Sequence, residues 1–135
     1  MMYTLTQFDG LEFLVANKNL IIATDPLEPF DELVCEFPVN FAFSYAFSLL
    51  ACNANIVRIP TKIFAQVQLI CDCITSVMSE LRFSIIKKMT TFVRYSQNDL
   101  ITGYFSSISD ARIIWGGDQA ISNIRKLPQP ERAID

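Results

Sequence analysis

The stretch DARIIWGGDQAISNIRK, residues 110–126, decides the fold class of this chain. Its first part, Ala111–Trp115, is short, apolar and rich in β-branched isoleucine, a pattern typical of a buried strand. Gly116 and Gly117 then allow a tight turn with positive φ and the close approach of a partner. Asp118 supplies a negative charge where a helix is expected to start, and apolar residues recur at helical spacing after it. The stretch therefore predicts a strand, a glycine turn and a helix.

The glycine pair has two interpretations. In an open parallel sheet, ligands bind where a strand ends and a helix begins, so the pair is a candidate ligand-binding turn. The alternative is a tight connection without a ligand, because an isolated glycine pair is a weak motif. The chain has only four glycines, and spacing alone favours the tight connection.

The chain before this stretch repeats the same alternation of elements. We expect an apolar helix over Asn40–Cys52, a strand over Asn55–Ile59, a long helix over Thr61–Leu81, a strand over Thr90–Tyr95 and a helix or helical turn over Ser96–Ser109. One face of the long helix is expected to be apolar, with Ile63, Val67, Ile70, Ile74, Val77 and Leu81. Strands alternating with helices predict a parallel sheet. The expected fold class is therefore α/β.

The N-terminal part gives weaker signals. Residues 1–22 mix apolar and polar residues and are compatible with a strand or a hairpin. The segment ATDPLEP, residues 23–29, predicts a connector, because two prolines within four residues interrupt regular structure. A short helix is expected over Phe30–Phe37, and Pro38 is then suited to the first turn of the next helix.

Composition bounds the class of function. The 135 residues allow one domain, and 51% hydrophobic residues are enough for a core. The net charge of −3 and the lack of a basic stripe argue against a nucleic-acid partner. The chain contains no histidine, which excludes a Ser-His-Asp or Cys-His mechanism and any imidazole metal site within it.

The four cysteines are Cys35, Cys52, Cys71 and Cys73, without a C-x-x-C pair. We expect them to be reduced, partly buried apolar residues in a cytoplasmic protein, with Cys71 and Cys73 on different sides of their helix. No secretory signal is expected at the N-terminus. The apolar run Phe37–Ala51 is too short and too polar for a membrane span, so we expect a buried helix there.

Two blocks of the sequence resemble a known family. They are NFAFSYAFSLLACNANIVRIPTKIFAQVQLICDCI, residues 40–74, and SDARIIWGGDQAISNIRKLPQPERAID, residues 109–135. In this order they are similar to the acyl-CoA reductases, the fatty acyl reductases of bacterial luminescence and their relatives, a branch of the aldehyde dehydrogenase superfamily. The family patterns are Leu-Leu-x-Gly-Asn-x-Asn-Ile-Val-Arg, and Asp-x-Arg-x-x-Trp-Gly-Gly-Asp followed by Pro-Arg-Ala-x-Asp. The resemblance covers roughly residues 38–135.

The resemblance implies a fold and an activity. The family reduces a long-chain acyl thioester to an aldehyde with NADPH, through a cysteine that takes the acyl group. The implied fold is a partial Rossmann-like open parallel sheet with flanking helices, of the aldehyde dehydrogenase cofactor-domain type. On this basis we divide the chain into a divergent N-terminal segment, residues 1–37, and a partial dinucleotide-binding domain, residues 38–135.

The resemblance also implies the cofactor residues. Arg58, Pro60, Thr61 and Lys62 match the strand-end turn that holds the adenosine ribose in the superfamily. A cation at Lys62 suits the 2′-phosphate of NADP, whereas two solvated cations are the alternative interpretation of Arg58 and Lys62. A second group matches the glycine turn beside the cofactor phosphates and nicotinamide, namely Trp115, Gly116, Gly117 and Asp118.

The chain also departs from the family pattern. Cys52 replaces the glycine of the Leu-Leu-x-Gly-Asn turn, and Glu36 stands where the superfamily has an oxyanion-stabilising asparagine. No cysteine matches the catalytic one, which lies in a later domain of the family, so we expect no catalytic residue here. We expect the chain to supply the cofactor half of a reductase, completed by a second polypeptide or by self-association. The alternative is a non-catalytic remnant that serves as a nucleotide-binding or interaction module.

Overall fold

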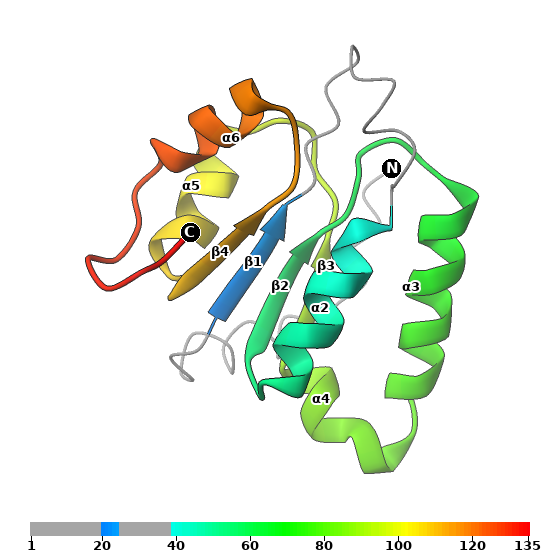
Figure 1. The fold of residues 1–135 in the computed structure, drawn as a ribbon. Coiled ribbons are helices and arrows are strands. Elements are labelled where there is room, and N and C mark those ends of the chain that lie inside the picture. The colour runs from blue at the N-terminus through cyan, green and yellow to red at the C-terminus, as the bar shows by residue number, and fades with distance from the viewer. Residues whose placement is uncertain (1–19, 25–38) are drawn as a thin grey trace.

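The computed structural model describes residues 20–24 and 39–135 as an α/β unit built on a parallel sheet (Figure 1). The sheet has four strands in the order β3-β2-β1-β4, and every neighbouring pair is parallel. The strands are β1 (Leu20–Thr24), β2 (Ala54–Arg58), β3 (Thr90–Val93) and β4 (Ala111–Ile114). The α/β class and the parallel sheet with flanking helices are confirmed.

The strand β1 occupies the middle of the sheet. Ile21 pairs with Asn55 of β2 on one side and with Ala111 of β4 on the other. The sheet therefore extends into the segment 1–37, and it has one strand more than the three that the clear sequence signals predicted. The connector predicted over residues 23–29 is wrong for Ala23 and Thr24, which end β1. The rest of it and the helix predicted over residues 30–37 lie outside the described residues.

The helices follow the predicted positions with different ends. They are α2 (Asn40–Leu50), α3 (Ala65–Met78), α4 (Ser84–Lys88), α5 (Asp99–Ser107) and α6 (Asp118–Arg125), with the 3₁₀ turn η2 (Leu81–Phe83) before α4. The long helix predicted to reach Leu81 ends at Met78, and η2 and α4 were not predicted. None of the helices in the described ranges is long and apolar enough to cross a membrane.

The main core lies between the sheet and the helices α2 and α3. Phe41 and Tyr45 of α2 pack edge-on against Phe92 of β3, with ring centroids 6.3 and 5.4 Å away. Val57 of β2 and Val67 of α3 complete this layer and are almost fully buried. The helix predicted in the apolar run is present as α2, but it is buried on one face only, because Phe43, Phe47 and Leu50 are exposed.

The buried face of α3 differs from the predicted one. Val67, Cys71 and Met78 are buried, and Ile70 and Ile74 pack against the core in part. In contrast, Ile63, Val77 and Leu81 are exposed. The prediction was wrong for these three because Ile63 precedes the helix and Leu81 follows it, while Met78 takes the core position next to Val77. As predicted, Cys71 and Cys73 point to different sides, since Cys71 is buried and Cys73 is exposed.

The helix α5 covers the opposite face of the sheet. Phe105 and Ile108 pack against Ala54 and Ile56 of β2. In Figure 1, α5 and α6 lie beside β4, whereas α2 and α3 lie on the side of β2 and β3. Because parallel sheets are stable when both faces are covered, this arrangement explains the continuous burial of β2.

The helix α2 ends in a left-handed turn at Cys52. The N–H of Cys52 donates to the carbonyl oxygen of Leu49 at 2.9 Å, and the N–H of Asn53 donates to that of Ser48 at 3.0 Å. This pair of bonds is the Schellman motif, whose C′ residue favours glycine. Cys52 has a φ of 60° and is the only residue other than glycine with positive φ in the part of the chain that the structure describes. The turn conformation at Cys52 is therefore one that favours glycine.

Replacing Cys52 by glycine should stabilise the fold. We expect Cys52→Gly to raise the free energy of unfolding by about 1 kcal/mol, because glycine removes the steric cost of the left-handed conformation. The matched control is Cys52→Ala, which keeps a Cβ and should change stability little. Urea denaturation of the three proteins measures the difference. An alanine variant as stable as the glycine variant would contradict this explanation.

Candidate functional site

The candidate site lies at the edge of the sheet where the parallel strands end. Residues 59–64 follow β2, residues 94–98 follow β3, and residues 115–117 follow β4. Because β2 and β4 flank β1, the two groups of predicted cofactor residues lie on either side of the end of β1. We call this the carboxyl edge.

Arg58 ties the ends of β2 and β3 together at the carboxyl edge. It is buried, its Nη2 donates to the carbonyl oxygen of Tyr95 at 3.2 Å, and its guanidinium lies 4.5 Å from the centre of the Tyr95 ring. Pro60 is also buried. Neither side chain is presented to solvent, so Arg58 is not the solvated cation of the alternative interpretation. Both residues serve the framework on which the loop is built.

Thr61 and Lys62 are the members of this turn that solvent reaches. The Oγ1 of Thr61 donates to the carbonyl oxygen of Tyr95 at 3.0 Å. The Nζ of Lys62 lies 5.4 Å from the centre of the Phe64 ring, just before α3 begins. A cation held beside an aromatic ring at a strand end can pair with an anionic ligand.

Tyr95 organises the loop after β3, a role that sequence analysis did not assign. Its carbonyl oxygen accepts from Arg58 and Thr61, and its Oη lies 3.1 Å from Oγ1 of Thr102 on α5. Burial raises the pKa of the Tyr95 phenol, which keeps it neutral and able to hydrogen bond at ordinary pH. Its position at the end of a predicted strand was the signal that could have indicated it.

The loop after β4 is anchored by its tryptophan. Nε1 of Trp115 donates to Oγ of Ser44 on α2 at 2.7 Å, while the residue stays 40% exposed. Gly117 is the N-cap of α6 with φ −70°, and Gly116 has φ 159°, close to extended backbone. The positive φ predicted for the pair is found at Gly116 but is wrong for Gly117, whose conformation other residues also adopt. Asp118 is exposed in the first turn of α6, where the helix dipole favours a negative charge.

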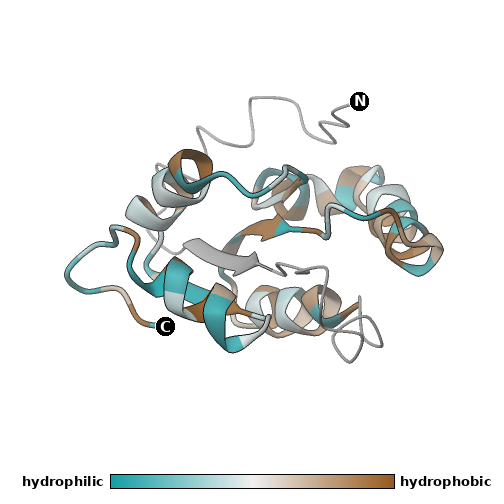
Figure 2. Cartoon of the chain, turned by 90° about the horizontal axis from the view of Figure 1, so that it is seen from above, coloured by the Kyte–Doolittle hydropathy of each residue, from teal (hydrophilic) through white to brown (hydrophobic). Residues whose placement is uncertain are grey.

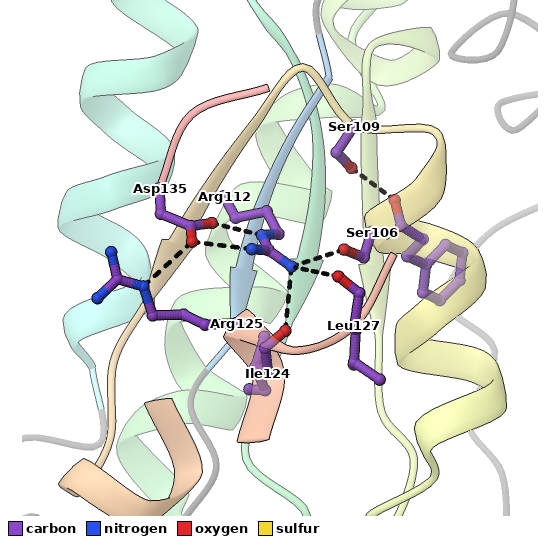
Figure 3. Close-up of polar contacts among 8 residues, drawn as sticks. Ser106, Ser109, Arg112, Ile124, Arg125, Leu127 and Asp135 are labelled. Carbon is purple, nitrogen blue, oxygen red and sulfur yellow. Dashed lines mark hydrogen bonds and ion pairs between the residues drawn. The ribbon is translucent and has the colours of Figure 1, made fainter. Parts of the chain in front are cut away.

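Arg112, Arg125 and Asp135 of the second family-like block form a structural cluster rather than a site. Figure 3 shows Arg112 at its centre. The Nε and Nη2 of Arg112 donate to the two carboxylate oxygens of Asp135, the latter at 2.8 Å. Its Nη1 donates to Oγ of Ser106 at 2.8 Å and to the carbonyl oxygen of Ile124 at 3.0 Å. The Arg112 side chain is only 2% exposed, so it joins α5, β4 and α6 from the inside.

The last residues run along β4 and cover part of its free edge. The N–H of Arg112 donates to the carbonyl oxygen of Ile134 at 2.8 Å, and the N–H of Ile134 donates to that of Asp110 at 3.1 Å. Arg132 pairs with Asp110 at 2.6 Å. The two motifs DAR and RAID are therefore each other's partners. Their opposite charges were the signal that could have predicted this pairing. We call these contacts the C-terminal clasp.

Removing the charge of Asp135 should weaken the clasp in a pH-dependent way. Hydrogen bonds from Arg112, helped by the charges of Arg112 and Arg125, hold the pKa of Asp135 below its ordinary value. The stabilisation is therefore present at neutral pH and is lost as the pH falls through the folded-state pKa. We expect Asp135→Asn to lower the free energy of unfolding at pH 7 by about 3 kcal/mol, the lower end for a buried ion pair.

The difference in the free energy of unfolding between wild type and Asp135→Asn should shrink as the pH is lowered toward the acid range. The carboxyl group of Asp135 is then protonated in both the folded and the unfolded state. Urea denaturation at a series of pH values measures it. Glu131→Gln is the control, because this substitution removes the same charge from an exposed residue nearby. A difference that stays constant down to acid pH would contradict the ion pair as its cause.

No protein-family model, no curated protein and no solved structure matches the chain. The features that bear on its function are therefore the strand order, the residues at the carboxyl edge and the motifs of the sequence itself.

Proposed function

We propose that this chain is the nucleotide-binding part of an NADPH-dependent acyl-CoA reductase. The observation that carries the proposal is the strand order β3-β2-β1-β4 in a parallel sheet. Doubly wound dinucleotide-binding folds have the same order in their first four strands, and they bind the ligand where the order reverses. In this chain the reversal falls between β1 and β4, directly beside the glycine turn.

The exposed residues of the carboxyl edge fit an anionic dinucleotide. Lys62 offers a cation and Thr61 a hydroxyl at the end of β2, where the ribose of a dinucleotide is held in such folds. The turn at Gly116 and Gly117 leads into α6, whose first N–H groups favour anions. NADPH would supply the hydride, and these residues would bind and orient the nucleotide. Arg58 and Trp115 contribute by anchoring the two loops.

The turn at Cys52 also supports the family assignment. The family pattern has glycine at this position, and the backbone there adopts the left-handed conformation that favours glycine. An accidental match of sequence letters does not require this agreement between the pattern and the backbone. It supports the alignment of the first family-like block with this chain.

The second candidate function is a nucleotide-binding or interaction module without catalysis. The positions of the cysteines favour it. Cys71 is buried, Cys52 follows the end of α2 that is remote from the carboxyl edge, and Cys73 lies in the second half of α3. Covalent acyl transfer needs an activated nucleophile, and none of the described cysteines provides one at the site. A reductase would therefore require a catalytic cysteine from another part of the enzyme.

Trp115 allows a direct test of the proposed site. It is the only tryptophan of the chain and lies in the β4 loop, so its fluorescence should be quenched when NADPH binds. Lys62→Glu should weaken NADPH binding by about tenfold or more, since a charge-assisted hydrogen bond contributes about 1.5–3 kcal/mol. NADH binding should be affected much less, because NADH lacks the 2′-phosphate.

The control for this titration is Lys126→Glu, which makes the same charge change at the other end of α6. It should leave the preference for NADPH over NADH unchanged. Equal losses of NADPH affinity in the two variants would mean that net charge alone causes the effect. They would reject Lys62 as the residue that binds the 2′-phosphate. A folded wild-type chain that binds neither nucleotide would reject the cofactor assignment and leave the interaction module.

A further inference from the structure

Arg94 is a cation at the carboxyl edge to which sequence analysis gave no role. It directly follows β3, whose last residue, Val93, is paired with β2. The N–H of Ile59 donates to the carbonyl oxygen of Val93 at 2.9 Å, so the two strands stay joined up to this point. Arg94 therefore lies beside the turn after β2 that carries Thr61 and Lys62.

The side chain of Arg94 lies on the side of the sheet that α2 and α3 cover. Seen from above, the sheet has helices on both of its sides (Figure 2). Phe92 packs against Phe41 and Tyr45 of α2, and residues two apart along a strand share a side of the sheet. The charge of Arg94 also acts on the thiol of Cys71 in α3, which agrees with this placement.

Lys62 lies on the same side of the sheet. Its Nζ is 5.4 Å from the centre of the Phe64 ring, and Phe64 packs against the core between the sheet and the helices α2 and α3. In contrast, the guanidinium of Arg58 lies over the ring of Tyr95, which contacts Phe105 of α5 on the other side. The exposed cation after β2 and the cation after β3 therefore share one side of the carboxyl edge.

Arg94 has a buried donor without an acceptor. Its Nε is buried and has no hydrogen-bond partner in the part of the chain that the structure describes, and the ion pairs found there do not include it. Cys71 does not balance the charge, because burial raises the pKa of its thiol, against the opposing effect of Arg94, and keeps it neutral at ordinary pH. A partly buried guanidinium with a free donor is suited to an anion from outside the chain.

The strand order determines which part of a bound nucleotide reaches Arg94, and this step rests on the proposed function. A dinucleotide that crosses the end of β1 has its adenosine at β2 and its nicotinamide toward β4. The strand β3 lies beyond β2, so only the adenosine end reaches the loop after β3. The anionic group that NADPH carries at this end, and that NADH lacks, is the 2′-phosphate.

We propose that Arg94 binds the 2′-phosphate of NADPH together with Lys62 and thereby sets the preference for NADPH over NADH. The ammonium of lysine acts as a point charge, whereas a planar guanidinium donates two parallel hydrogen bonds to one phosphate. The Nε of Arg94 that lacks an acceptor in the free chain is one of these two donors. Since the phosphate is the group recognised, fragments of the nucleotide without nicotinamide are sufficient probes.

The test is isothermal titration calorimetry of the full chain with adenosine 2′,5′-bisphosphate and with adenosine 5′-monophosphate. Arg94→Met should weaken binding of the bisphosphate by about tenfold or more, because charge-assisted hydrogen bonds are lost, and should change binding of the monophosphate little. Arg94→Lys keeps the charge without the second donor, so its affinity should lie between the two. Arg82→Met is the matched control, because it removes an exposed arginine from η2, and it should bind both probes as the wild type does.

Urea denaturation without nucleotide separates binding from a structural role. Because the Nε of Arg94 has no acceptor in the described part of the free chain, Arg94→Met should leave the urea midpoint unchanged or raise it. A lowered midpoint, or an equal loss of affinity for both probes, assigns Arg94 to the framework and overturns the inference. If the wild type prefers NADPH and Arg94→Met keeps that preference, only this inference fails. A folded wild type that binds neither NADPH nor NADH rejects the proposed function as well.

Discussion

The pairing of β1 with both β2 and β4 is the constraint on which the rest of the structure depends. Ile21 lies between Asn55 and Ala111, so the middle strand sets the register of both halves of the sheet. Parallel pairing then forces the strand ends to one edge, because every strand runs in the same direction. The loops that carry Lys62 and Trp115 come together only through this strand, although they are far apart in sequence.

The two edges of the sheet have different chemistry. The carboxyl edge presents hydroxyl, ammonium and carboxylate groups on loops that are anchored by buried contacts of Arg58 and Trp115. The amino edge, where the strands begin, presents an apolar pocket, whose lining includes Leu49, Ile74, Val77 and Ile86. This difference follows from the helices, since α2 and α3 both end near the start of the strands with apolar residues in their last turns. We therefore propose the ligand at the carboxyl edge.

The C-terminal clasp changes the interpretation of a motif. Asp110, Arg112, Arg132 and Asp135 belong to the patterns that resemble the reductase family, and charged residues in such patterns are commonly taken as functional. Here they satisfy one another, and the guanidinium of Arg112 also donates to Ser106 and to backbone carbonyl groups. A buried arginine needs this full set of partners, because an unpaired buried charge is costly. Their role is to hold α5, α6 and the last residues on β4.

The sequence by itself determined the local structure and the fold class. Short isoleucine-rich runs between polar residues predicted β2 and β4, and apolar helical spacing predicted α2, because burial of one face follows from local periodicity. Tertiary structure decided the rest. The central place of β1, the burial of Arg58 against Tyr95 and the partners of Arg112 all depend on residues far apart in the chain. Local patterns carry no information on such partners, since only the folded sheet brings them within hydrogen-bond distance.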